Sequence, residues 1–180
     1  MGDTYYTLHV AVLTRELPIC PVNDNLDIAA FIMFSDVELT VACAQELLKA
    51  VPEYDVIITA ESKGIPLAYE MSRQSGKKYL LARKSKKVYM SRAVEVDVQS
   101  ITTKGLQKLY LDTSHLDEIK GRRVLIVDDV VSTGESLAAL ERLVELTGGK
   151  IAGKAAVLAE GDAADRKDLI FLEKLPLFFK

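Results

Sequence analysis

The sequence predicts an α/β fold in which a mainly parallel sheet of five strands is flanked by helices. Two segments, residues 55–74 and 124–146, each run from a short apolar stretch through a polar loop with a glycine into an amphipathic helix. Such apolar runs are typical of strands that are buried on both faces of a parallel sheet. Strands that alternate with helices in this way indicate an α/β sheet rather than an all-β domain.

The composition is that of a soluble globular chain with a single domain over residues 1–180. Of the 180 residues, 49% are hydrophobic and 27% are charged, which is enough apolar material for a sizeable core. The net charge of -3 argues against a nucleic-acid partner, which needs a broad positive surface. The sequence shows no membrane-spanning apolar run and no leader pattern, so we expect no membrane contact and a cytoplasmic location. Two cysteines without CxxC spacing argue against a structural zinc site.

The N-terminal segment, residues 1–35, is predicted to form a small hood beside the sheet. Residues 6–13 alternate in polarity as a strand does, and residues 15–22 continue as a second extended piece that prolines break. The first long helix is expected over residues 36–50, because apolar residues recur there at helical spacing.

The stretch from Val124 to Ser136 has the most specific chemical pattern in the chain. Its apolar run, residues 124–127, ends at Asp128 and Asp129, where side chains can emerge at the carboxyl edge of a sheet. A small polar loop then leads into a helix over residues 137–146, and this loop consists of Ser132, Thr133, Gly134, Glu135 and Ser136. Free backbone amides at a helix N-terminus, together with hydroxyl groups, make an anion site that suits a phosphate monoester.

The two acids need a partner that lies between them and the anion. Ribose hydroxyls could donate to Asp128 and Asp129, and Mg²⁺ could bind carboxylate and phosphate oxygens together. The alternative is an ordinary strand-to-helix corner with Ser132 or Thr133 as the helix N-cap and with solvated acids. The loop is not a Walker loop, because the sequence has no Gly-Lys-Ser or Gly-Lys-Thr.

This stretch resembles the binding signature for phosphoribosyl diphosphate (PRPP) in the type I phosphoribosyltransferases. The resemblance implies that Asp128 and Asp129 contact the ribose as catalytic residues, and that residues 132–136 hold the 5′-phosphate. It also implies PRPP and a purine base as substrates, Mg²⁺ bound via PRPP with the acid pair as candidate ligands, and a homodimer. The same signature occurs in non-catalytic regulators, so the rest of the chain has to supply the remaining parts of a site.

A second anion loop follows the strand predicted over residues 55–60. It consists of Glu61, Ser62, Lys63 and Gly64 and leads into a helix over residues 65–74. Lys63 and the loop amides can bind an anion, and Gly64 lets the backbone approach a ligand or take a positive φ. The loop resembles the pyrophosphate loop of adenine phosphoribosyltransferases, with Lys63 in place of an arginine. A surface turn with a solvated lysine is the alternative.

Four positive charges lie within residues 83–87, directly after a strand predicted over residues 77–82. Such a run is usually a solvated face. Here, however, the strand ends at the same sheet edge as the two anion loops, where the charges can meet a pyrophosphate. The resemblance to adenine enzymes assigns Arg83, Lys84 and Lys87 to the pyrophosphate, with Lys84 as a catalytic cation.

Residues 88–111 alternate in polarity on both sides of residues 102–105, which predicts a long hairpin. Type I phosphoribosyltransferases carry a flexible hairpin here that closes over the active site. Adenine enzymes place a glutamate two residues before a glycine in this hairpin. This chain has Thr103 there, which does not provide the same acid or base.

The C-terminal part supplies the last strands and a candidate contact with the base. Residues 151–159 are predicted as a buried strand, and Glu160 at its carboxyl end could accept from a purine amine or imino group, with a solvated turn as the alternative. Phe31 lies in a segment that resembles the one after the base-covering loop of adenine enzymes; a place in the core is the alternative. Residues 169–172 and 175–179 close the chain as short extended pieces.

The predicted function is that of a purine phosphoribosyltransferase of purine salvage, with adenine as the first choice of base. Xanthine, hypoxanthine and guanine stay open, because the aromatic and proline-rich hood signature and the hairpin glutamate are missing. The alternative from another class is a non-catalytic regulator that senses PRPP. Such a regulator needs a DNA-binding module, and the stretch before Leu26 shows neither a winged-helix pattern nor a basic face.

Overall fold

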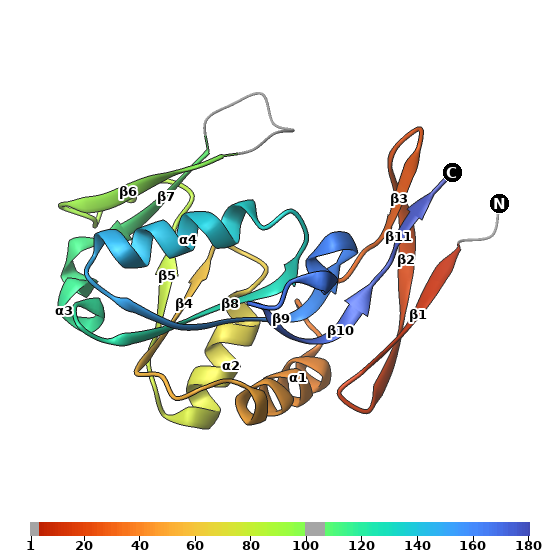
Figure 1. The fold of residues 1–180 in the computed structure, drawn as a ribbon, viewed down its shortest axis with the longest axis horizontal. Coiled ribbons are helices and arrows are strands. Elements are labelled where there is room, and N and C mark those ends of the chain that lie inside the picture. Colours follow the sequence, from red (N-terminus) through yellow and green to blue (C-terminus); the bar gives the residue numbers. More distant parts are fainter. Residues whose placement is uncertain (1–3, 100–106) are drawn as a thin grey trace.

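Residues 4–99 and 107–180 are described by a computed structural model, and they form a parallel sheet with helices on both faces (Figure 1). The sheet has five strands, and every neighbouring pair is parallel. In spatial order the strands are β10 (Ile170–Leu175), β9 (Lys150–Glu160), β8 (Arg123–Val131), β4 (Val56–Ala60) and β5 (Tyr79–Ala82). The predicted fold class is therefore confirmed.

The two central strands, β4 and β8, correspond to the apolar runs from which the fold was predicted. Every residue of β4 is buried. Side chains alternate between two cores, because Ile58 and Ile126 lie in one hydrophobic cluster while Ile57 and Leu125 lie in the other. Burial on both faces leaves the carboxyl ends of these strands as the place where polar side chains can gather.

Helices α1 (Val37–Ala50) and α2 (Ile65–Ser75) cover one face of the sheet, and α4 (Glu135–Leu146) covers the other (Figure 1). Helix α1 begins where it was predicted, because the Asp36 side chain accepts from the backbone N of Leu39 at 3.1 Å and caps the helix. Three short helical pieces complete the described helices: η1 (Thr113–His115), α3 (Leu116–Ile119) and η2 (Gly161–Asp165). Within the described ranges, no helix has the length and apolar character that spanning a bilayer requires.

The predicted hairpin is confirmed in its two strands, β6 (Ala93–Val98) and β7 (Gln107–Asp112), which pair antiparallel. It packs over α4, where Val96 and Leu109 join the same hydrophobic cluster as Leu140 of the helix (Figure 1). The tip of the hairpin, with Thr103, lies outside the described residues.

The N-terminal hood is a second, antiparallel sheet that the C-terminal strand completes. This hood sheet consists, in spatial order, of β1 (Tyr5–Val10), β2 (Leu13–Asn23), β3 (Leu26–Ala29) and β11 (Leu177–Phe179). The prediction that prolines break the second extended piece is wrong, because β2 is continuous. Pro18 pairs through its carbonyl oxygen, which accepts from the backbone N of Ala30 at 2.9 Å, and Pro21 lies at a register shift in the ladder with β3.

An aromatic contact joins the two edge strands of the hood sheet, and we expect it to contribute to stability. The rings of Phe178 and Tyr6 meet edge to face with centroids 5.8 Å apart. We expect Phe178→Ala to lower the free energy of unfolding by about 2 kcal/mol, less than the loss for a fully buried phenylalanine. Urea unfolding measures this loss. Phe179, whose side chain is 77% exposed, provides the matched control, and equal losses in both variants would contradict the assignment.

Candidate active site

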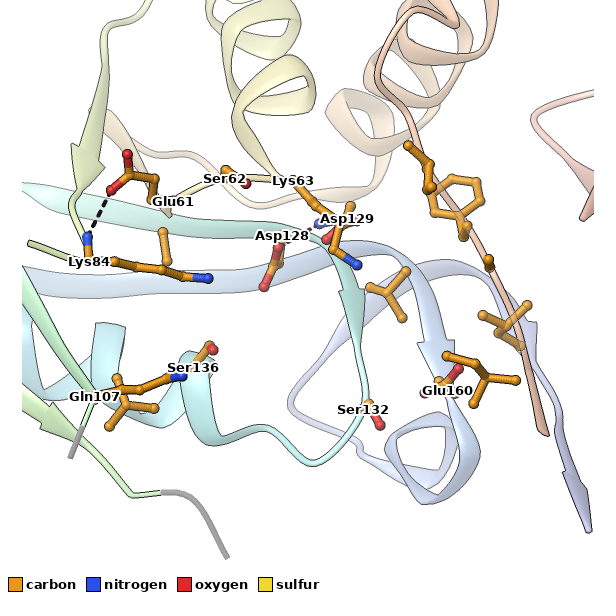
Figure 2. Close-up of a pocket in the computed structure, with 18 of the residues that line it drawn as sticks. Glu61, Ser62, Lys63, Lys84, Gln107, Asp128, Asp129, Ser132, Ser136 and Glu160 are labelled. Atoms are coloured by element: carbon orange, nitrogen blue, oxygen red, sulfur yellow. Dashed lines mark hydrogen bonds between the residues drawn. The ribbon is translucent and has the colours of Figure 1, made fainter. Parts of the chain in front are cut away.

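The two predicted anion loops meet at the carboxyl ends of β4 and β8. After β4 the chain continues through α2 to β5, whereas after β8 it continues through α4 to β9, on the other side of the sheet. Connections that diverge from two neighbouring parallel strands leave a crevice between them, which is the usual ligand site of an open α/β sheet. A cavity of about 390 Å³ lies there, between the loops, the hairpin and the segment that follows β3 (Figure 2).

Most of the predicted site residues lie on the walls of this main cavity or of a smaller one beside it. The main cavity is lined by Phe31, Glu61, Ser62, Lys63, Lys84, Asp128, Asp129, Ser132, Ser136 and Glu160, among others. The smaller cavity, of about 150 Å³, is lined by the whole loop over residues 132–136 and by Asp128. Gly64, Arg83 and Lys87 line neither cavity.

The acid pair lies within strand β8 rather than after it. The prediction that the acids end the strand is wrong, because β8 runs on to Val131. The neighbouring strand β9 is long enough to keep pairing, so that Asp128 lies opposite Ala156 and Val131 lies opposite Ala159. Both acids are therefore held by the hydrogen bonds of the sheet, which positions side chains more rigidly than a loop does.

The environment of the acid pair disfavours two negative charges. Asp128 Oδ1 accepts from the backbone N of Asp129 at 2.8 Å. Burial, and then the neighbouring Asp129 carboxylate, raise the pKa of Asp128 well above its ordinary value, while the charge of Lys63 acts in the opposite direction. Asp129 is 4% exposed, and its Oδ2 atom has no hydrogen-bond partner among residues 4–99 and 107–180. A buried carboxylate oxygen of this kind is suited to a donor or a cation supplied by a ligand.

Two side chains of the loop after β4 have different neighbours within the protein. Lys63 lies beside the acid pair (Figure 2). Glu61 instead accepts from Arg83 Nε at 3.0 Å and from the backbone N of Lys84 at 2.8 Å. Burial acts to raise the pKa of Glu61, but these two donors outweigh it and hold the pKa below its ordinary value. Glu61 thus anchors the basic segment to the loop.

Gly64 was predicted to allow either a close approach of the backbone or a positive φ. Its φ is −77°, which excludes the second of these two reasons. A Cβ at this position would lie 2.5 Å from Thr59 Oγ1 and 3.0 Å from Asp128 Oδ1. The glycine therefore lets the start of α2 pack directly against the acid pair, which is a structural reason for the residue that the sequence alone did not reveal.

The basic run is only partly directed to the cavity. Lys84 lies on the wall of the main cavity (Figure 2). Arg83 Nη1 donates to the Tyr89 hydroxyl at 2.7 Å, and Lys87 Nζ donates to Ser85 Oγ at 2.7 Å. The structure thus brings one of the three predicted cations to the site.

Helix α4 begins after a glycine. The N-cap residue is Gly134, with φ +80°, which has no side chain that could cap the first turn. The alternative with Ser132 or Thr133 as N-cap is therefore wrong. The first-turn amides and the loop hydroxyls surround the smaller cavity, as an anion site requires.

The main cavity also extends to strand β3 of the hood sheet and to the segment that follows it. Phe31 is only 4% exposed, so it belongs to the core as well as to the wall. Glu160 is half-buried, and burial raises its pKa, while the Ser132 side chain and the charge of Lys63 oppose the rise. Val130 and Leu175 also lie on this wall and were not predicted from the sequence. Val130 follows Asp128 at strand spacing and Leu175 ends β10, so a longer predicted β8 and the carboxyl-edge rule would have found both.

Comparisons with known proteins agree with this geometry. The family model of the phosphoribosyl transferase domain matches residues 39–174. A hypoxanthine/guanine phosphoribosyltransferase of Methanosalsum zhilinae is 29% identical over 91% of this chain and 74% of its own length. An adenine phosphoribosyltransferase of Cenarchaeum symbiosum is 37% identical over 64% of this chain and 66% of its own length.

The solved structures show the same fold. The crystal structure of an adenine phosphoribosyltransferase from Thermoanaerobacter pseudethanolicus superposes with a TM-score of 0.67 at 24% identity, over 79% of this chain and 84% of that one. Because the family model covers most of the chain, including both anion loops and the acid pair, the chain belongs to the phosphoribosyltransferase family.

Proposed function

We propose that the protein is a purine phosphoribosyltransferase that transfers the phosphoribosyl group of PRPP to adenine. The observation that carries this proposal is the acid pair on β8, which lies between a helix N-terminus and a cationic loop within one crevice. Charged groups in this order match the order of groups in PRPP, where a ribose separates a phosphate monoester from a pyrophosphate. Relatives named for adenine and for hypoxanthine and guanine agree with a purine as the acceptor.

Each part of the site has a proposed role. Residues 132–136 hold the 5′-phosphate, and Asp128 and Asp129 accept from the ribose hydroxyls. Lys63 and Lys84 offset the charge that develops on the leaving pyrophosphate. A ring nitrogen of the base forms a bond to C1 while the bond from C1 to the pyrophosphate oxygen breaks, with its electron pair leaving on the oxygen, and the base releases a ring proton. The sugar carries positive charge in between, so positioning and electrostatics are the main tasks of the protein.

The acid pair also fits Mg²⁺. Asp129 Oδ2, which has no hydrogen-bond partner within the described ranges, and the adjacent Asp128 are oxygen ligands of the type this ion prefers. Among the described residues, no group of three or more His, Cys, Asp or Glu side chains could hold a metal. PRPP oxygens and water would therefore complete the coordination, and the ion would neutralise charge on the pyrophosphate. We further propose that the protein is a homodimer, that it is located in the cytoplasm, and that it acts in purine salvage.

The identity of the base is tested by direct assay. The protein is incubated with PRPP, Mg²⁺ and each of adenine, hypoxanthine, guanine and xanthine, and nucleotide formation is followed by chromatography. We expect product with adenine. Product with another base alone would correct the specificity, whereas PRPP binding without product from any base would overturn the transferase assignment in favour of a PRPP sensor.

Glu160 provides a prediction about base recognition. If its carboxylate accepts from the base, Glu160→Gln should lower kcat/KM for the base about tenfold and leave the KM for PRPP unchanged. Because the pKa of Glu160 is raised, the KM for the base should rise in the wild type as the pH falls through that pKa, but not in the variant. Asp162→Asn, in the same turn but not on the cavity wall, is the matched control. A loss confined to PRPP affinity would contradict the assignment.

A further inference from the structure

Arg166 makes a close contact with the loop over residues 132–136, although it lies far along the chain from that loop. It directly follows η2, the turn after β9. Its Nη1 atom is 2.6 Å from the position that a Cβ of Gly134 would occupy. The guanidinium therefore covers the side of Gly134 where any other residue would carry its side chain.

The guanidinium is held in this place by a fixed ion-pair network. Arg166 Nε and Nη2 donate to the two carboxylate oxygens of Asp168 at 3.0 and 2.9 Å, a bidentate arrangement. Lys154 of β9 donates to the same carboxylate at 2.6 Å and to Glu141 of α4 at 2.7 Å. The network thus joins the turn after β9, strand β9 and the helix that the loop begins.

The contact lies behind the loop rather than in the ligand cavity. Arg166 lines neither of the two cavities described above, whereas Gly134 lines the smaller one. Gly134 has φ +80°. Because a glycine has no side chain, its backbone can change from this conformation to many others at little steric cost. A rigid group packed on its open side restricts those alternatives before a ligand arrives, and such preorganisation reduces the entropy lost on binding.

We propose that Arg166 is a positioning residue of the phosphate loop: its guanidinium, held by Asp168, packs on Gly134 and keeps the loop in the conformation that receives a phosphate monoester. This inference rests on the proposed function, in which residues 132–136 bind the 5′-phosphate of PRPP. It adds a residue that acts through the loop and does not touch the ligand.

Binding of ribose 5-phosphate and of inorganic phosphate tests the proposal without any transfer reaction. Calorimetry should show about tenfold weaker binding in Arg166→Ala, and Arg166→Lys should restore little of it, because lysine lacks the planar fork. In the assay with PRPP, KM for PRPP should rise while kcat and the KM for the base stay near wild type. Lys167→Ala removes an exposed positive charge one residue away and should bind as the wild type does.

Asp168→Asn separates positioning from simple attraction between charges. The variant removes a negative charge near the loop but breaks the fork that holds Arg166. A purely electrostatic role predicts tighter phosphate binding in this variant, whereas a positioning role predicts weaker binding. Tighter binding in Asp168→Asn, or equal losses in Arg166→Ala and Lys167→Ala, would overturn the proposal.

A double-mutant cycle tests the contact itself. Gly134→Ala should weaken phosphate binding on its own, and its cost should be smaller in the Arg166→Ala background, because the clash with Nη1 is then absent. Additive losses would show that the two groups do not touch, which would overturn the proposal.

If the wild type binds neither phosphate ligand, the proposed function fails at this loop, and the role of Arg166 fails with it. Wild-type binding with no loss in Arg166→Ala would refute this role alone.

Discussion

Asp128→Asn should lower kcat by at least about a hundredfold and, at the same time, make the ligand-free protein more stable. The loss of activity follows from the proposed role of Asp128, because an amide neither orients the ribose hydroxyls as a carboxylate does nor stabilises positive charge on the sugar. The gain in stability is expected because the pKa of Asp128 is raised by burial and by Asp129, so ionisation at neutral pH costs folding free energy. We expect a gain of about 1 kcal/mol, or about 2–4 °C in Tm for a chain of this size.

The pH dependence of stability tests the physical cause. Between the ordinary pKa of 3.8 and the raised pKa of Asp128, the folded protein binds more protons than the unfolded chain. The contribution of Asp128 to stability therefore falls through this interval as pH rises, and the advantage of Asp128→Asn over the wild type should grow with pH and then level off. Urea unfolding at several pH values measures this difference. A variant that is inactive but equally or less stable at neutral pH would contradict the account of the acid pair.

Gly64→Ala should reduce both stability and activity, even though Gly64 borders neither cavity. The new methyl group would meet Thr59 Oγ1 at 2.5 Å, and Thr59 is fully buried and has no room to withdraw. We expect a loss of about 1–3 kcal/mol in the free energy of unfolding. The methyl would also press on Asp128 Oδ1, and a displacement of about 1 Å at a reacting centre can cost on the order of a hundredfold in kcat.

Thr59→Ala provides the compensating change for this prediction. The Oγ1 atom of Thr59 has no hydrogen-bond partner in the described part of the chain, so its removal breaks no hydrogen bond there. The double variant Gly64→Ala/Thr59→Ala should therefore recover a large part of the stability that Gly64→Ala loses. Absence of any recovery would show that the backbone of Asp128, rather than Thr59, sets the limit.

The sequence predicted the features that depend on local pattern. The apolar runs predicted β4 and β8, and the polar residues that follow them predicted the two anion loops. These predictions were possible because buried strands and helix starts have short-range sequence patterns. The hydrogen bond from Arg83 to Glu61 and the contact of Arg166 with Gly134 were beyond this reasoning. Both depend on which residues the fold brings together from distant parts of the chain, and a single sequence carries no signal for such pairs.

The pairing of β11 with β3 has a consequence for the order in which the protein folds. Residue 28 leaves the ribosome about 150 residues before its partner, residue 177, a delay of roughly 10–30 s at ordinary rates of synthesis. The β1–β2 hairpin closes locally, but the outer edge of β3 stays unpaired throughout that time. A contact of such high sequence separation also forms slowly after release. The hood sheet, whose strand β3 borders the main cavity, is thus completed only after the whole parallel sheet has been synthesised.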